Sequence, residues 1–140
     1  MAQALRALVT FEMPVIEPVG ALRGAAKKDH GLELYAAGDY EAAVIELESS
    51  VSARRPDLLH VLGACHLRAG RARAAIDSLT RAVKGLPHSA DTHWLLAQAH
   101  LLNDDPESAT KSLKKVEKLG GDLGEAAATL QEQLAKLLES

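Results

Sequence analysis

The sequence is poor in aromatic residues, with one Trp, one Phe and two Tyr among 140 residues. Its hydrophobic content is nevertheless 47%, so the core has to be built from Ala, Leu and Val. Strands are enriched in aromatic and β-branched side chains, whereas small side chains suit closely packed helices. A chain of this length is one domain by the usual prior. The composition therefore favours a single all-α domain.

Cysteine and excess positive charge are also scarce. The one cysteine, Cys65, excludes an intramolecular disulfide, which fits a reducing compartment. The formal charge of −3 provides no broad basic field, so we expect no nucleic-acid partner. The apolar amino-terminal run is broken by two acids and two prolines, and we expect neither a signal peptide nor a membrane span. These features predict a cytoplasmic protein with no membrane partner.

The most regular stretch runs from Asp57 to Pro87. Small and large apolar residues recur in it at helical spacing on both sides of Gly70, a residue that breaks helices. Those before the break are Leu59, Leu62, Gly63 and His66, and those after it are Ala75, Leu79 and Ala82. The pattern predicts two helices joined by a turn.

Weaker copies of this pattern lie on both sides. The first copy precedes it by 32 residues with Gly31, Leu34, Gly38, Ala43 and Leu47, and the third follows it by 34 residues with Ala97, His100, Ala109 and Leu113. We predict three helix–turn–helix repeats at about 22–55, 56–89 and 90–121 within residues 20–121, the first helix running from about Gly20 to Ala37. Its polar positions Lys27, His30 and Glu33 are typical of a terminal repeat. Residues 122–140 predict an amphipathic capping helix, and residues 1–19 an extended apolar segment.

The order of these residues resembles the tetratricopeptide pattern, W-x2-L-G-x2-Y, then A-x3-F, then P, with a period of about 34 residues. The opening aromatic of the motif is missing, since Leu59 and His93 occupy it in the second and third repeats. The resemblance implies a right-handed helical solenoid whose leading helices line a concave groove for extended or helical peptides. Carried over by motif position, the peptide-binding groove comprises Lys28, Leu32, Tyr35, Asp57, His60, Ala64, Leu67, Arg68, Asp91, Trp94, Gln98, Leu101 and Leu102.

This groove predicts a protein–protein interaction module, either an adaptor or a chaperone-like protein, that binds an extended segment of a partner. Tyr35 and Trp94 are its aromatic residues, which either anchor a ligand or pack between helices. Some tetratricopeptide modules clamp a carboxylate with Lys and Asn side chains. Here Leu32, Ala64 and Gln98 stand where Asn would be wanted, so the sequence departs from that pattern.

The amino-terminal segment suggests a second function. It carries apolar residues that are unusual for a free tail, namely Phe11, Met13, Val15 and Ile16. Val9 to Val19 could span on the order of 30 Å, similar to three leading helices side by side. As a self-docking segment it could plug the groove of its own chain, or swap into a second copy and make a homodimer. It could also pack outside the first repeat. The alternative function is thus a self-assembling scaffold.

Chemical sites are not expected. His66 and His100 occupy the motif's Tyr position, where the residue packs between helices, and no Cys or acid lies at metal-ligand spacing. His60 and His93 fit groove-edge hydrogen-bonding groups that could respond to mild acid. We find no nucleophile motif or phosphate loop, and expect no enzyme activity, metal or cofactor. Arginines near the turns form either a docking patch for an acidic partner or a solvated edge: Arg54, Arg55, Arg68, Arg71 and Arg73.

Overall fold

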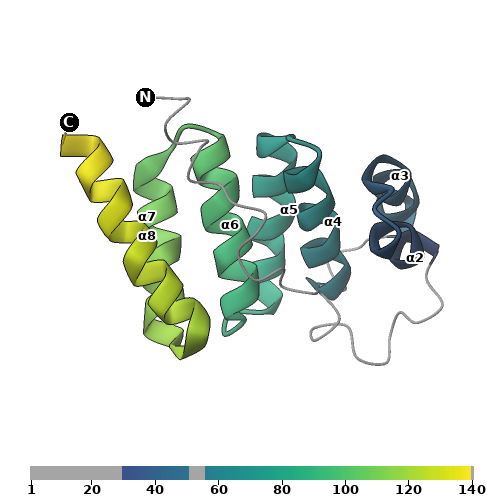
Figure 1. The fold of residues 1–140 in the computed structure, drawn as a ribbon. Coiled ribbons are helices and arrows are strands. Elements are labelled where there is room, and N and C mark those ends of the chain that lie inside the picture. The colour runs from purple at the N-terminus through teal and green to yellow at the C-terminus, as the bar shows by residue number, and fades with distance from the viewer. Residues whose placement is uncertain (1–29, 51–55, 140) are drawn as a thin grey trace.

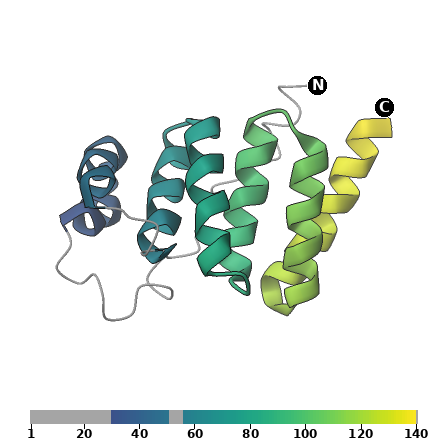
Figure 2. The same cartoon turned by 180° about the vertical axis from the view of Figure 1, so that it is seen from behind.

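A computed structural model describes residues 30–50 and 56–139, which form seven helices and no strands. The helices are α2 (His30–Ala36), α3 (Tyr40–Ser50), α4 (Pro56–Arg68), α5 (Ala72–Gly85), α6 (Ala90–Leu102), α7 (Pro106–Leu119) and α8 (Gly121–Glu139). They stand side by side in a row that begins with α2 and α3 and ends with α8 (Figures 1 and 2). The predicted all-α, tetratricopeptide-like fold is confirmed. The predicted start of the first helix, near Gly20, lies outside the described residues.

Each helix packs against the next one, and the leading helices also contact one another, α2 with α4, α4 with α6, and α6 with α8. The leading helices therefore form one continuous layer, and α3, α5 and α7 stand behind it. Three apolar clusters fill the space between the layers. The first joins α2, α3 and α4, the second joins α4, α5 and α6, and the third joins α6, α7 and α8.

The turn inside each helix pair has the same backbone geometry. Gly38, Gly70 and Asp104 occupy matching positions, and all three have a positive φ, of 84°, 79° and 60°. The next residue donates its amide to the carbonyl of Leu34, His66 or His100 at 2.8–2.9 Å. These bonds satisfy carbonyls that the helix end would leave without a partner, as in a Schellman motif. The repeat inferred from residue spacing therefore recurs in the hydrogen bonds of the backbone.

Close helix packing depends on one glycine in the central pair. A Cβ atom built on Gly63 would lie 2.4 Å from Cγ of Leu79, a fully buried side chain of α5. The absence of a side chain at Gly63 thus lets α4 and α5 approach each other around Leu79. The third repeat has Ala97 and Leu113 at the equivalent positions, and both are fully buried.

The last helix closes one end of the row. α8 buries Leu123, Ala127, Leu130 and Leu134 in a cluster with residues of α6 and α7. Ala127, Leu130 and Leu134 follow His93, Leu96 and His100 by 34 residues, so α8 continues the register of the leading helices. It therefore covers the third repeat as another leading helix would.

Candidate peptide-binding surface

The residues predicted to line the groove fall on the leading helices α2, α4 and α6. Lys28 lies outside the described residues, and the side chain of Leu32 is likewise not described. Half-buried positions are Tyr35, Asp57, Arg68, Asp91 and Leu102, whereas His60, Ala64, Leu67, Trp94, Gln98 and Leu101 are buried. Most of this set is therefore enclosed. The self-docking residues Phe11, Met13, Val15 and Ile16 lie outside the described part of the chain.

Helix α4 is buried all round over most of its length. Leu58 to Leu67 are ten consecutive buried residues, and they include the predicted groove positions His60 and Ala64. With 3.6 residues per turn, ten residues cover every direction around the helix axis. A helix that is buried on all sides is typical of a core. The inward face of α4 is therefore covered.

A chain of polar side chains links α4 to α6 within this covered region. Nδ1 of His60 lies 2.8 Å from Oγ1 of Thr92, and the Thr92 hydroxyl donates to Oγ of Ser89 at 2.8 Å. Thr92 therefore satisfies Nδ1 of His60, whichever of the two groups donates. Nε2 is the ring nitrogen that takes no part in this chain.

The environment keeps His60 neutral. Burial lowers the pKa of His60 from its ordinary value near 6.5 to about 4, since the charged ring would lose its hydration. Its Nε2 atom is buried without a hydrogen-bond partner. The groove-edge histidine expected from the sequence is thus a buried, neutral residue with one ring nitrogen unpaired. Sequence reasoning did not identify Ser89 and Thr92, although a serine three residues before a threonine at a helix start is a capping signal.

Trp94 lies in the core cluster of α6, α7 and α8 and is 1% exposed. Of the two alternatives for this residue, packing between helices accounts for its position. Tyr35 lies in a cluster at the other end, where its ring and that of Tyr40 are 5.5 Å apart. The guanidinium of Arg68 lies 5.5 Å from the centre of the Tyr40 ring. Burial raises the pKa of Tyr35 against the opposing effect of Arg68. This cluster joins the first and second helix pairs.

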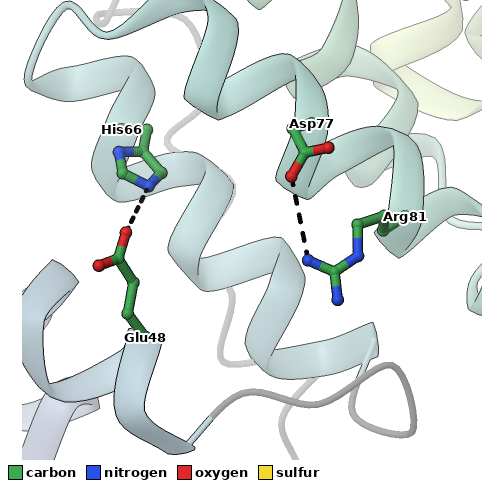
Figure 3. Close-up of polar contacts among 4 residues, drawn as sticks. All are labelled: Glu48, His66, Asp77 and Arg81. Atoms are coloured by element: carbon green, nitrogen blue, oxygen red, sulfur yellow. Dashed lines mark ion pairs between the residues drawn. The ribbon is translucent and has the colours of Figure 1, made fainter.

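Arg71 and His66 make local contacts with acidic side chains. Arg71 pairs with Glu41 at 3.7 Å, and both side chains are exposed. On the outer side, Nε2 of His66 lies 3.6 Å from Oε1 of Glu48 (Figure 3). Burial lowers the pKa of His66, and Glu48 opposes that shift. Arg54 and Arg55 lie outside the described residues.

A hollow of about 220 Å³, which the sequence did not predict, lies beside this histidine. Its charged lining comes from α3 and α5, with Glu48, Asp77 and Arg81, and Arg81 pairs with Asp77 at 3.9 Å (Figure 3). Two carboxylates and one guanidinium line it, so its charged side chains carry a net charge of about −1. Across residues 30–50 and 56–139, no group of three or more His, Cys, Asp or Glu could hold a metal ion.

Cys65 is fully buried, and burial raises its pKa to about 12. A thiol reacts as its thiolate, so this residue packs in the core as a small apolar side chain. None of the helices in the described ranges is long and apolar enough to cross a membrane.

Comparison with known proteins agrees with the repeated geometry. A family model described as tetratricopeptide repeat matches residues 66–134, from the end of α4 into α8. A search of curated proteins finds no match. Proteins built from these repeats are typically interaction modules without enzyme activity. Together with the matching turns and the packing of consecutive helices, this match supports a repeat protein of the tetratricopeptide type.

Proposed function

We propose that this protein is an adaptor or chaperone-like module that binds an extended apolar segment of a partner protein on the inward face of α4 and α6. The observation that carries the proposal is the chemistry of that face. Four of its six buried residues are apolar, and the other two contribute the unpaired Nε2 atom of His60 and the amide of Gln98. Apolar surface with a few fixed polar groups is typical of peptide grooves, because the polar groups orient the ligand.

The proposal divides the chain as the sequence suggested, into repeats at about 22–55, 56–89 and 90–121 with a capping helix after them. The groove residues that remain suitable for a ligand are those near the surface or with unused polar atoms. Trp94 packs in the core and is therefore a poor residue to substitute in a binding test. Tyr35 and Leu102 are half-buried and are better choices, and Gln98 contributes the side-chain amide of this face.

The test is binding of fluorescent peptides of about ten residues with alternating apolar side chains, measured by anisotropy. Wild type is compared with Gln98→Ala and Leu102→Ala, and with Ile45→Ala as the matched control, because Ile45 is 70% exposed on α3. We expect the groove variants to bind at least fivefold more weakly and the control to bind as wild type does. Equal affinity in all four proteins would reject the groove as the binding surface.

The scaffold alternative predicts self-association. Light scattering over a hundredfold range of concentration separates the two functions, since a monomer at every concentration contradicts a self-assembling scaffold. A cytoplasmic location is part of the proposal and is checked by fractionation of the native cell.

A further inference from the structure

The inward positions of α4 and α6 are buried more completely than the open groove of a two-layer solenoid would leave them. α2, α3, α5 and α6 contact α4, but a two-layer solenoid has no third layer over the inward face of its leading helices. Ala64 and Gln98 occupy predicted inward positions on α4 and α6 and are only 2% and 4% exposed. The residues outside the described part of the chain are 1–29, 51–55 and 140. Of these stretches, residues 1–29 alone are longer than five residues.

His60 also lacks a hydrogen-bond partner on one side of its ring. Its Nδ1 atom is paired with Thr92, whereas its Nε2 atom is buried without a partner. A buried polar atom without a partner is costly, so native structures rarely leave one unpaired. A backbone group of a covering segment, an N–H or a C=O according to the tautomer of the ring, would satisfy it.

We propose that residues 9–19 of the same chain lie along the inward face of α4 and α6, with a backbone polar group hydrogen-bonded to Nε2 of His60. The apolar side chains that would cover the two helices are Phe11, Met13, Val15 and Ile16. Pro14 and Pro18 favour the extended backbone that such a groove accepts.

The connection to α2 is long enough for this arrangement. Residues 20–29 can span about 33 to 36 Å when extended. Two steps between neighbouring packed helices, from α2 to α6, take only about 16 to 20 Å. The inference rests on the proposed function, since it names the resident ligand of the same groove, which a partner segment has to displace.

Disulfide trapping in the full chain tests the contact. In a Cys65→Ser background, Ala64→Cys is combined in turn with Phe11→Cys, Met13→Cys and Val15→Cys. A disulfide needs Cα atoms within about 7 Å. We expect at least one pair to form an intramolecular cross-link under mild oxidation, seen as a faster non-reduced band. The control replaces Ala64→Cys by Ile45→Cys on the exposed surface of α3, and should give none.

Two results would overturn the proposal. One is the absence of a cross-link in all three groove pairs, or equal cross-linking to Ile45→Cys. The other is a cross-link that joins two chains, which would show a swap into a second copy. Unfolding of each variant is checked by circular dichroism, and a second measurement covers the case in which Ala64→Cys does not fold.

The second measurement uses a labelled synthetic peptide of residues 9–19, VTFEMPVIEPV, and leaves the helices unchanged. Phe11→Asp with Ile16→Asp should displace the resident segment, so that the peptide binds this variant at least tenfold more tightly than wild type. The control is Glu12→Gln with Glu17→Gln, which keeps the apolar residues and should bind as wild type does. Adding His60→Leu to the Phe11→Asp, Ile16→Asp variant should weaken binding about threefold to tenfold, the effect of one hydrogen bond. Equal binding by wild type and the double Asp variant would contradict the proposal.

Neither experiment uses a partner protein. The proposed function fails if the groove variants bind partner-like peptides as well as wild type does, whereas this inference fails if the chain's own segment neither cross-links nor competes. The two failures are therefore distinguishable.

Discussion

At the scale of single residues, Gly63 carries the tightest helix contact. Alanine is a better helix former than glycine by about 1 kcal/mol, but its Cβ would lie 2.4 Å from Cγ of Leu79. Leu79 is fully buried and has little room to move. Overpacking of a core costs about 1–3 kcal/mol, so the clash outweighs the gain in propensity.

We therefore expect Gly63→Ala to lower the free energy of unfolding by about 1–2 kcal/mol in urea titrations. Gly124→Ala is the matched control, since its Cβ would meet backbone atoms of α7 at 3.4 Å or more. It should leave stability unchanged or raise it slightly. A stable Gly63→Ala protein would show that α4 and α5 can separate without cost.

His60 predicts a pH dependence of stability. Its pKa is about 4 in the folded chain and near 6.5 when unfolded, so the unfolded state binds more protons between these values. The free energy of unfolding should therefore fall as the pH is lowered through this window, by about 2 kcal/mol between pH 7 and pH 5 from this residue alone.

The measurement is urea unfolding of wild type and His60→Gln at both pH values. Burial also lowers the pKa of His66, His93 and His100, so the variant should keep part of the dependence. An identical decrease in both proteins would mean that His60 is accessible to protons in the folded state.

At the scale of the helices, α3 and α7 are each preceded by an Asp that caps the helix, whereas α5 is not. Asp39 accepts from the amide of Ala42 at 3.3 Å, and Asp105 accepts from the amide of Ser108 at 3.1 Å. The equivalent residue before α5 is Arg71, whose side chain makes no capping bond. Ser, Thr, Asp and Asn cap helix N-termini, and each cap contributes about 1 kcal/mol.

Arg71→Ser should thus raise the midpoint of urea unfolding by an amount equivalent to about 0.5–1 kcal/mol, with an unchanged slope. The loss of the pair with Glu41 subtracts little, because both side chains are exposed. Arg73→Ser, within the helix, is the control and should give no gain. A decrease in stability for Arg71→Ser would show that its ion pair contributes more than a cap.

Whether the sequence predicts a structural element depends on whether its pattern arises from residues close together in the chain. Glycines at Gly38 and Gly70 and the apolar spacing around them mark the helix pairs, because both arise from local backbone geometry and helix periodicity. α3 begins at Tyr40, because Asp39 caps the helix. The bond of His60 to Thr92 joins residues on different helices, and no local pattern predicts it.

At the scale of the whole molecule, position in a motif gives the direction of a side chain but does not give its burial. Ala64 and Gln98 were placed inward by spacing, but their enclosure depends on everything that packs around α4 and α6. Trp94, one position after the expected aromatic, lies in the cluster that α8 completes. A repeat motif describes one unit, whereas the packing of such residues depends on neighbouring units.

The packing of α8 therefore predicts how the end of the solenoid responds to substitution. Leu130 is buried against α6 and α7, whereas Leu138 on the same helix is 46% exposed. Leu130→Ala should lower the free energy of unfolding by about 2–5 kcal/mol, and Leu138→Ala by no more than about 0.5 kcal/mol.

Detachment of α8 would also uncover the apolar residues of α6 and α7 that it now covers. The Leu130→Ala protein should therefore self-associate as its concentration rises. The Leu138→Ala protein should behave as wild type does. Light scattering on both variants and on wild type measures this. If Leu130→Ala were as stable and as free of association as Leu138→Ala, α8 would not be the element that closes this end of the repeat, and the third helix pair would have to be stable without it.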